Sequence, residues 1–319
     1  MISTRERRTE QAFFRGGLLT LADEHYLRAV RTFAEALLRD DVGSGDLTAK
    51  ALGLAERIVR GAVISREGGV AAGLDECAFL FRGRGIEVAF EKRDGDAIAP
   101  GETLMRLEGP EISQLACERV GLNLVQRMCG IATAARCLQE RVRRRGLHAR
   151  VVGTRKTPWG LLDKRALHLG GAGTHRLNLS DAILIKNNHL ALLAPSEAEA
   201  APLAIERAWK CRGNAAFIEV EVRDEAAALG AAQAFRRLRR DAQDDYPCLL
   251  MLDNMTPGRI GAVAAMLERE NLRDDILIEA SGGISEANIE AYAESGVDAI
   301  SVGALTHSAR ALDICLRIS

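Results

Sequence analysis

The chain has 319 residues, of which 47% are hydrophobic and 27% charged, and its formal net charge is −1 at pH 7. These are the proportions of an ordinary globular protein, and a near-neutral chain lacks the basic excess typical of nucleic-acid-binding proteins. No apolar stretch approaches the ~20 residues that cross a membrane, and the charged N-terminus has no apolar signal core. We therefore expect a cytoplasmic protein of two domains, without a nucleic-acid or membrane partner.

The first half of the chain predicts a small α/β domain. Apolar residues recur at helical spacing over Leu19–Leu38, and short strand-like runs broken by turn signals follow over Ile58–Leu107, with a helical insert near Leu74–Arg84. A long helical stretch over Glu111–Arg145 is expected to link the two domains. We place the first domain at residues 23–145, preceded by an N-terminal extension over residues 1–22.

The second half predicts an α/β barrel over residues 146–305. Short apolar runs alternate with helical segments, an alternation typical of parallel strands joined by right-handed connections. The final segment, residues 306–319, is expected to pack back on the first domain. The six expected strands are Ala149–Val152, Ala182–Ile185, Phe217–Val222, Leu249–Leu252, Ile276–Ile278 and Ala299–Val302.

Acidic residues occur within or directly after two of these strands. Glu219 and Glu221 are two residues apart in one strand, so their side chains point to the same face, and Asp253 ends the next strand. Glu219 is equally well explained as part of a structural ion-pair layer. Glu221 and Asp253 lie nearer the strand ends, where barrel enzymes carry their active sites, and together they could hold a divalent ion such as Mg²⁺ on a phosphorylated substrate.

Basic residues follow the neighbouring strands or a glycine-rich turn. These residues are Arg155, Lys156, His175, Arg176 and Lys186. So many cations in one cavity predict a multiply anionic substrate, because Arg presents a planar fork to carboxylate or phosphate and Lys a point charge. His175 taken alone is more often a packed, hydrogen-bonded histidine than a catalyst.

Two glycine turns follow the last two expected strands. Ser281-Gly282-Gly283 follows one strand and Gly303 follows the next. Backbone N–H groups of such turns can cradle a phosphate, as the last two strands of many barrels do.

Several of these segments together resemble the quinolinate phosphoribosyltransferase family. The segments are Asp41–Thr48 (DVGSGDLT), Glu118-Arg119, Thr154–Thr157 (TRKT), His175-Arg176-Leu177, Asp181–Lys186 (DAILIK), Glu219–Val222 (EVEV), Leu252–Asn254 (LDN), Ser281–Ile284 (SGGI) and Gly303–Ser308 (GALTHS). They occur in the family's order from about Leu37 to the C-terminus.

The resemblance implies an N-terminal α/β sandwich domain joined to an open, incomplete α/β barrel, in homodimers that share active sites. It implies transfer of the phosphoribosyl group of phosphoribosyl pyrophosphate to quinolinate, with decarboxylation to nicotinate mononucleotide, and Mg²⁺ as cofactor. The implied roles are as follows: Arg119 reaches the neighbouring subunit's site; Arg155, His175 and Arg176 bind the quinolinate carboxylates; Lys156 and Lys186 lie near the ribose and diphosphate; Glu221 and Asp253 position ribose hydroxyls and, indirectly, Mg²⁺; Ser281, Gly282, Gly283 and Gly303 bind the 5-phosphate.

Two departures from the family pattern leave alternatives open. The segment after Thr157 reads Pro158-Trp159-Gly160, about two residues shorter than usual and without the family's loop Arg, and Asn187 stands where the family commonly has an acid. Trp159 could stack on a substrate ring or pack within a rigid loop. A related phosphoribosyltransferase for another aromatic acid, and a barrel lyase or aldolase with Lys186 as Schiff-base nucleophile, are the alternative functions.

Overall fold

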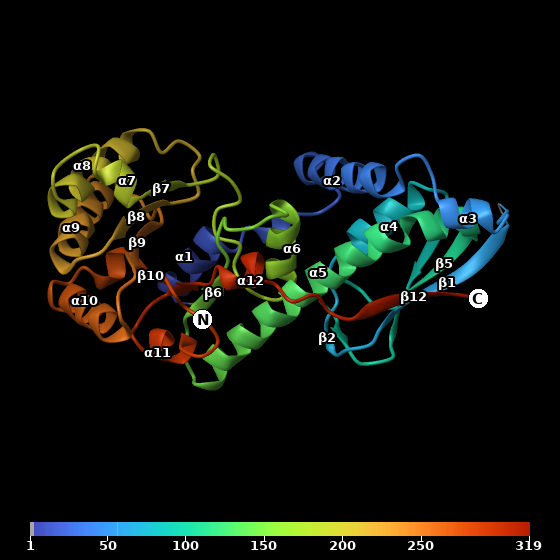
Figure 1. Ribbon diagram of the computed structural model, residues 1–319. Helices are drawn as coiled ribbons and strands as arrows, with labels where there is room; N and C mark the ends of the chain where they lie inside the picture. Colours follow the sequence, from blue (N-terminus) through green and yellow to red (C-terminus); the bar gives the residue numbers. More distant parts are fainter. Residues whose placement is uncertain (1–2, 56) are drawn as a thin grey trace. The chain divides into compact units, whose positions relative to one another are not determined.

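The computed structural model describes residues 3–55 and 57–319 (Figure 1). Met1 and Ile2 of the expected N-terminal extension, and Glu56 of the expected first domain, lie outside these residues. The chain forms two compact units. We call residues 1–15, 137–157 and 172–304 the barrel unit, and residues 16–136, 158–171 and 305–319 the sandwich unit.

The barrel unit is built on a six-stranded parallel sheet. Its strand order is β6-β11-β10-β9-β8-β7, and β6 and β7 do not pair with each other in the described part of the chain, so the barrel is open. The strands are β6 (Arg150–Val152), β7 (Ile183–Ile185), β8 (Ile218–Val222), β9 (Cys248–Asp253), β10 (Leu277–Ser281) and β11 (Ala299–Ser301). The predicted parallel α/β barrel is confirmed.

Helices connect these strands and cover the sheet (Figure 1). Three of them, α8 (Glu197–Lys210), α9 (Glu225–Ala242) and α10 (Pro257–Arg269), begin after Ser196, Asp224 and Thr256, whose side chains accept a hydrogen bond from a backbone N–H of the first turn. Their buried faces are rich in alanine, which brings helix and strand backbones close together. Shorter helical elements are α7 (Asn187–Leu190), η2 (Arg273–Asp275), α11 (Ile289–Ala293) and α12 (Ala304–His307).

The barrel unit also contains the N-terminal helix α1 (Thr4–Phe13). Ser3 and Glu6 form a reciprocal capping box at its start. Ala12 and Phe13 at its end are fully buried, mostly against the amino ends of the strands, in a core cluster with Val152, Ala182, Phe217, Leu249, Leu277 and Ala299. The N-terminal segment is therefore part of the barrel core and not an appendage.

The sandwich unit contains an antiparallel sheet of order β12-β1-β5-β3 and a two-stranded pair. Its strands are β1 (Ile58–Ser65), β2 (Gly69–Val70), β3 (Glu87–Phe90), β4 (Ala97–Ile98), β5 (Thr103–Pro110) and β12 (Ile314–Ile318). β12 pairs with β1, so the C-terminal residues complete this sheet. The helices are η1 (Gly16–Leu18), α2 (Glu24–Val42), α3 (Leu47–Ala51), α4 (Leu74–Arg82) and α6 (Leu161–Leu169).

The long helix α5 (Glu111–Arg144) runs through both units, up to Arg136 in the sandwich unit and from Cys137 in the barrel unit. The units differ from the expected domain boundaries in several places, one of which is the end of α5, which was expected in the first domain and belongs to the barrel unit from Cys137. Residues 3–15 pack with the barrel because Ala12 and Phe13 enter its core, and α6 belongs to the sandwich unit. In the described residues no helix is long and apolar enough to cross a membrane.

Candidate active site

Polar side chains gather where the parallel strands end at their carboxyl edge. Arg155 and Lys156 follow β6, Gly303 follows β11, Ser281 ends β10, Asp253 ends β9, Glu221 lies near the end of β8, and Lys186 follows β7. Since these strands are neighbours in that order, the residues form one row along the edge of the sheet. The carboxyl edge is where barrel enzymes carry their active sites.

The strand register places three of these groups on one face of the sheet. Ile185 pairs with Val220, so Lys186 comes level with Glu221, and its Nζ lies 3.2 Å from the Glu221 Oε2. Glu221 pairs with Met251, so Asp253 projects from the same face two residues further along. Glu221 is buried, Asp253 is half-buried and Lys186 is exposed. The site thus holds two carboxylates and an ammonium group beside solvent.

The turn after β10 requires glycine. Gly282 has φ +99° and Gly283 has φ +61°. A methyl group added to Gly282 would lie 2.2 Å from the Asn254 Oδ1 and 2.9 Å from the Asn254 backbone nitrogen. The Asn254 N–H donates to the Ser281 carbonyl at 2.8 Å, which fixes this turn against the end of β9. The backbone N–H groups of a turn with positive φ form a concavity suited to an anion.

Arg155 and Arg176 form the basic part of the site. Burial and the charge of Arg155 lower the pKa of Arg176, which shows that the two guanidinium groups influence each other. Arg155 and Lys156 are exposed, whereas Arg176 is only 6% exposed and donates from Nη1 to the Ala182 carbonyl at 3.3 Å. Two neighbouring cations favour binding of a dianion. Arg119 belongs to the sandwich unit, where it is exposed on α5.

His175 lies inside the barrel unit and not at the exposed edge. Its Nε2 is 3.2 Å from a carboxylate oxygen of Glu219 and 3.2 Å from one of Glu279, and both glutamates are fully buried. Its ring lies 5.3 Å from the ring of Phe13 and 5.4 Å from that of Phe217. Glu219 therefore lies beside a basic side chain in this structure, as the ion-pair interpretation predicts.

The hydrogen bonds of His175 argue against a metal ion in this cluster. His175, Glu219 and Glu279 have ligand atoms within 4.8 Å of one another. However, the Arg176 N–H donates to the His175 Nδ1 at 2.7 Å, so Nδ1 carries no proton. A neutral imidazole must then carry its proton on Nε2, which leaves no lone pair there for a metal. We therefore describe the cluster as one imidazole and two carboxylates that share a proton.

Burial and charge make this cluster retain protons. Burial and the neighbouring Glu279 raise the pKa of Glu219 to about 7. The folded protein therefore binds a proton on Glu219 more tightly than the unfolded chain does.

We expect the barrel unit to lose stability as pH rises. Because the pKa of Glu219 is higher in the folded state, stability is greatest below the unfolded value of 4.5 and falls as pH rises towards 7. The slope is about 1.4 kcal/mol per pH unit for each proton. Denaturant unfolding of Glu219→Gln between pH 5 and 9 is expected to show a shallower slope between pH 5 and 7 than the wild type. The exposed Glu225→Gln is the control, and equal slopes in all three proteins would contradict the prediction.

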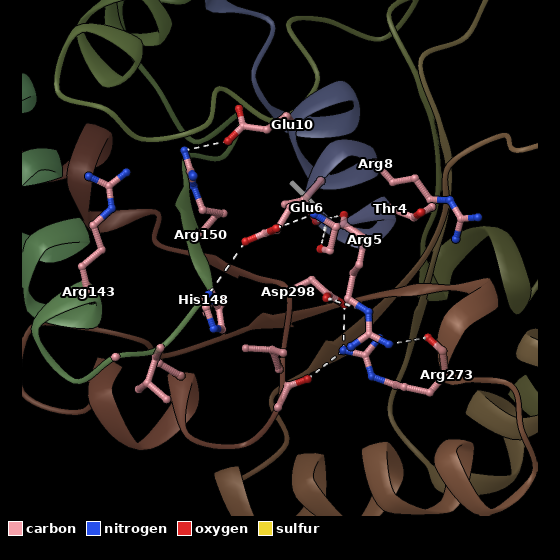
Figure 2. Close-up of a pocket in the computed structure, with 18 of the residues that line it drawn as sticks. Thr4, Arg5, Glu6, Arg8, Glu10, Arg143, His148, Arg150, Arg273 and Asp298 are labelled. Atoms are coloured by element: carbon pink, nitrogen blue, oxygen red, sulfur yellow. Dashed lines mark hydrogen bonds and ion pairs between the residues drawn. The ribbon is translucent and has the colours of Figure 1, made fainter. Parts of the chain in front are cut away.

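A cavity of about 1160 Å³ lies at the opposite, amino edge of the barrel unit (Figure 2). It is lined by α1 and by the segments that precede β6, β10 and β11. Arginines and acids line it in similar numbers, and several are paired, such as Arg150 with Glu10 at 2.9 Å and Arg273 with Asp298 at 2.9 Å (Figure 2). This balance of charge does not favour the multiply anionic ligand that the carboxyl edge favours.

Trp159 packs within the sandwich unit. Its ring lies 4.9 Å from the ring of Phe33, and the Arg127 guanidinium lies 5.0 Å above it. The same guanidinium donates two 2.8 Å hydrogen bonds to Asp163, which is fully buried. Of the two interpretations of Trp159, the structure favours packing within a rigid loop. Asn187 is half-buried, and its Oδ1 accepts from the Asn188 N–H at 2.7 Å.

Sequence reasoning missed two residues of this region, Glu279 and Phe13. Glu279 was placed just beyond its strand, whereas β10 continues to Ser281 and directs Glu279 inward. The available signal was the spacing of Glu279 and Ser281, which are two residues apart and so would lie on the same face of a longer strand. For Phe13, the Ser3-x-x-Glu6 capping box in the sequence indicates a helix that would carry Phe13 at its end.

Comparison with known families agrees with this geometry. The model of the N-terminal domain of quinolinate phosphoribosyl transferase matches residues 46–129, and that of the C-terminal domain matches residues 131–317. Curated relatives include the probable nicotinate-nucleotide pyrophosphorylase [carboxylating] of Methanothermobacter thermautotrophicus, 38% identical over 88% of this chain and 96% of the relative. The enzyme of that name from Mycobacterium leprae is 36% identical over 90% of this chain and 96% of its own.

Solved structures give the same result. NadC from Streptococcus pyogenes aligns over 91% of this chain and 96% of its own, with a TM-score of 0.77 at 31% identity. The nicotinate-nucleotide pyrophosphorylase from Francisella tularensis aligns over 92% and 96%, with a TM-score of 0.78 at 28% identity. Two family models that together span residues 46–317, and relatives above 30% identity over most of the chain, establish that this chain belongs to the quinolinate phosphoribosyl transferase family.

Proposed function

We propose that the chain transfers the phosphoribosyl group of phosphoribosyl pyrophosphate to quinolinate and decarboxylates the product, which gives nicotinate mononucleotide, CO₂ and pyrophosphate. The observation that carries the proposal is the row of side chains at the carboxyl edge. The row combines Arg155, two lysines, two carboxylates and two glycine turns, and Arg155 lies near enough to Arg176 to lower the pKa of that guanidinium, which suits a dicarboxylate beside a polyphosphate. Family membership agrees with this chemistry.

Arg155 and Arg176 would bind the two carboxylates of quinolinate. Lys156 and Lys186 would face the ribose and the diphosphate, and Glu221 and Asp253 the ribose hydroxyls. Ser281, Gly282, Gly283 and Gly303 would hold the 5-phosphate through the turns after β10 and β11. His175 would act indirectly: its Nδ1 accepts the backbone N–H of Arg176 and so helps to hold Arg176 in place.

The donor set at the edge fits Mg²⁺. Glu221 and Asp253 project from the same face of neighbouring strands, and both offer the oxygen ligands that Mg²⁺ prefers. Because the Lys186 ammonium already lies 3.2 Å from Glu221, the carboxylates would hold Mg²⁺ indirectly, through water and the diphosphate. When bound, Mg²⁺ would supply charge stabilisation for the leaving pyrophosphate.

The reaction proceeds in two steps. The quinolinate nitrogen attacks C1 of the ribose while the bond from C1 to the pyrophosphate oxygen breaks, and pyrophosphate leaves with that electron pair. Lys156 and Lys186 stabilise the leaving charge, and Glu221 and Asp253 stabilise the positive charge that develops on C1. The ring nitrogen is then a cation and draws electrons. The bond to the 2-carboxylate therefore breaks with loss of CO₂, and a proton takes the electron pair left on the ring carbon.

We also propose a homodimer in which Arg119 of the partner subunit completes the site. Its exposure on α5 supports a role outside its own unit's core. A cytoplasmic location agrees with substrates that are small soluble anions.

The decisive experiment is an Mg²⁺-dependent assay with quinolinate and phosphoribosyl pyrophosphate that follows nicotinate mononucleotide and CO₂, with nicotinate as the control acceptor. Turnover with quinolinate and not with nicotinate is the expected result. A folded protein that binds phosphoribosyl pyrophosphate but does not turn over quinolinate would overturn the assignment of the acceptor.

A further inference from the structure

The N-terminal segment of this chain, residues 3–15, precedes the first residue that the family models match, at position 46. It nevertheless ends in the barrel core, because Phe13 is fully buried, mostly among the amino ends of the strands. Ion pairs hold the segment at its middle and at its end. Arg8 near its middle pairs with Asp245, and Arg15 at its end pairs with Asp181 at 2.9 Å.

Its last residues hold the backbone of the turn that carries Arg176. The Phe13 carbonyl accepts the N–H of Thr174 at 2.7 Å and the N–H of His175 at 3.1 Å. The Arg15 N–H donates to the Thr174 Oγ1 at 3.3 Å. These bonds run from the N-terminal segment directly to the two residues before Arg176.

The same turn is held on its other side through Asp181. One carboxylate oxygen of Asp181 lies 2.9 Å from the Arg15 Nε, and the other accepts the Leu177 N–H at 2.8 Å. The backbone is therefore held on both sides of Arg176, at residues 174–175 and at residue 177. The contacts on both sides connect to the N-terminal segment.

The turn needs such support because His175 has φ +54°, a left-handed conformation that residues other than glycine rarely adopt. The Phe13 ring lies 5.3 Å from the His175 ring, which is itself buried beside the fully buried Glu219 and Glu279. A strained backbone persists only where its surroundings fix it.

We propose that the N-terminal segment is a positioning element for the acceptor site: it fixes the turn over residues 174–177 so that Arg176 meets a carboxylate of the acceptor. Phe13 and Arg15 are positioning residues and do not touch substrate. The inference rests on the proposed function for the identity of the acceptor, but the anchoring itself does not depend on it.

The test compares Arg15→Gln with Arg8→Gln. Each variant removes one guanidinium that ties the segment to the barrel unit, but only Arg15 leads to the turn. Arg15→Gln is expected to raise the KM for quinolinate about tenfold, with the KM for phosphoribosyl pyrophosphate within twofold of wild type. Arg8→Gln is expected to leave both KM values within twofold. Equal effects of the two variants, or equal changes in both KM values for Arg15→Gln, would overturn the proposal.

A second variant and a second readout separate this proposal from the function. Thr174→Val keeps the shape of the side chain and removes the oxygen that accepts the Arg15 N–H. Thr174→Val and Arg15→Gln are both expected to speed amide hydrogen exchange at residues 174–177 at least tenfold, while exchange in α9 is unchanged. Exchange in the turn as slow as in the wild type would contradict the anchoring. Failure of the wild type to use quinolinate, with faster exchange in the variants, would contradict only the proposed acceptor.

Discussion

Lys186→Met is expected to reduce kcat at least 100-fold while the fold is retained. Lys186 is exposed at the end of β7, and its ammonium is 3.2 Å from the buried Glu221 carboxylate. The substitution removes the charge that would stabilise the leaving pyrophosphate, and it also leaves Glu221 without this cation. The loss of one such electrostatic group from a preorganised site costs about 10²–10³ in kcat. Steady-state kinetics with quinolinate and phosphoribosyl pyrophosphate measure the effect.

Lys210→Met is the matched control, because Lys210 is an exposed lysine at the end of α8 and its loss changes the net charge equally. Its kcat is expected to stay within twofold of wild type. Lys186→Arg keeps a cation beside Glu221 and is expected to recover part of the lost activity. A Lys186→Met protein with nearly full kcat would show that this lysine does not act on the leaving group.

The strands of the barrel unit could be predicted because each one is a short apolar run flanked by polar residues. The six predicted runs overlap β6 to β11 with differences of one to three residues at their ends. The long helix predicted over Glu111–Arg145 ends at Arg144. Local pattern determined these elements, since a parallel strand buried on both faces is mostly apolar.

The surroundings of His175 could not be predicted in the same way. His175, Glu219 and Glu279 come from a turn and from two strands, β8 and β10, that are separated by β9. Their meeting depends on the register and curvature of the whole sheet, which no local pattern contains. The position of Glu219 within its strand indicates an ion-pair layer, but the partners of Glu219 could be identified only in three dimensions.

The N-terminal segment shows a second limit. The helix α1 is strongly polar, and only Ala12 and Phe13 at its end enter the core. With so few apolar positions, the helical periodicity that predicted α2 is absent. The capping box predicts that a helix forms here, but it does not predict where that helix packs. The burial of Phe13 depends on the core residues that surround it, and those come from distant parts of the sequence.

Gly282→Ala is expected to weaken binding of phosphoribosyl pyrophosphate about 10- to 100-fold. At φ +99° an alanine is strained, and its methyl group would lie 2.2 Å from the Asn254 Oδ1 and 2.9 Å from the Asn254 backbone nitrogen. The backbone at the end of β9 cannot move without losing its 2.8 Å hydrogen bond to Ser281. The turn must therefore shift, at a cost of about 1–3 kcal/mol, and a tenfold change corresponds to about 1.4 kcal/mol. Calorimetric titration of phosphoribosyl pyrophosphate with Mg²⁺ measures the loss.

Two glycine variants separate the phosphate site from a general loss of stability. Gly258→Ala lies in the first turn of α10 with open space around it, and its affinity is expected to match the wild type. Gly283→Ala also meets no atom, but its φ of +61° gives a smaller strain than at Gly282 and an intermediate loss. The expected order of affinity is wild type and Gly258→Ala, then Gly283→Ala, then Gly282→Ala. If Gly282→Ala bound as tightly as Gly258→Ala, the turn after β10 would not hold the 5-phosphate, and the phosphate would have to bind elsewhere on the carboxyl edge.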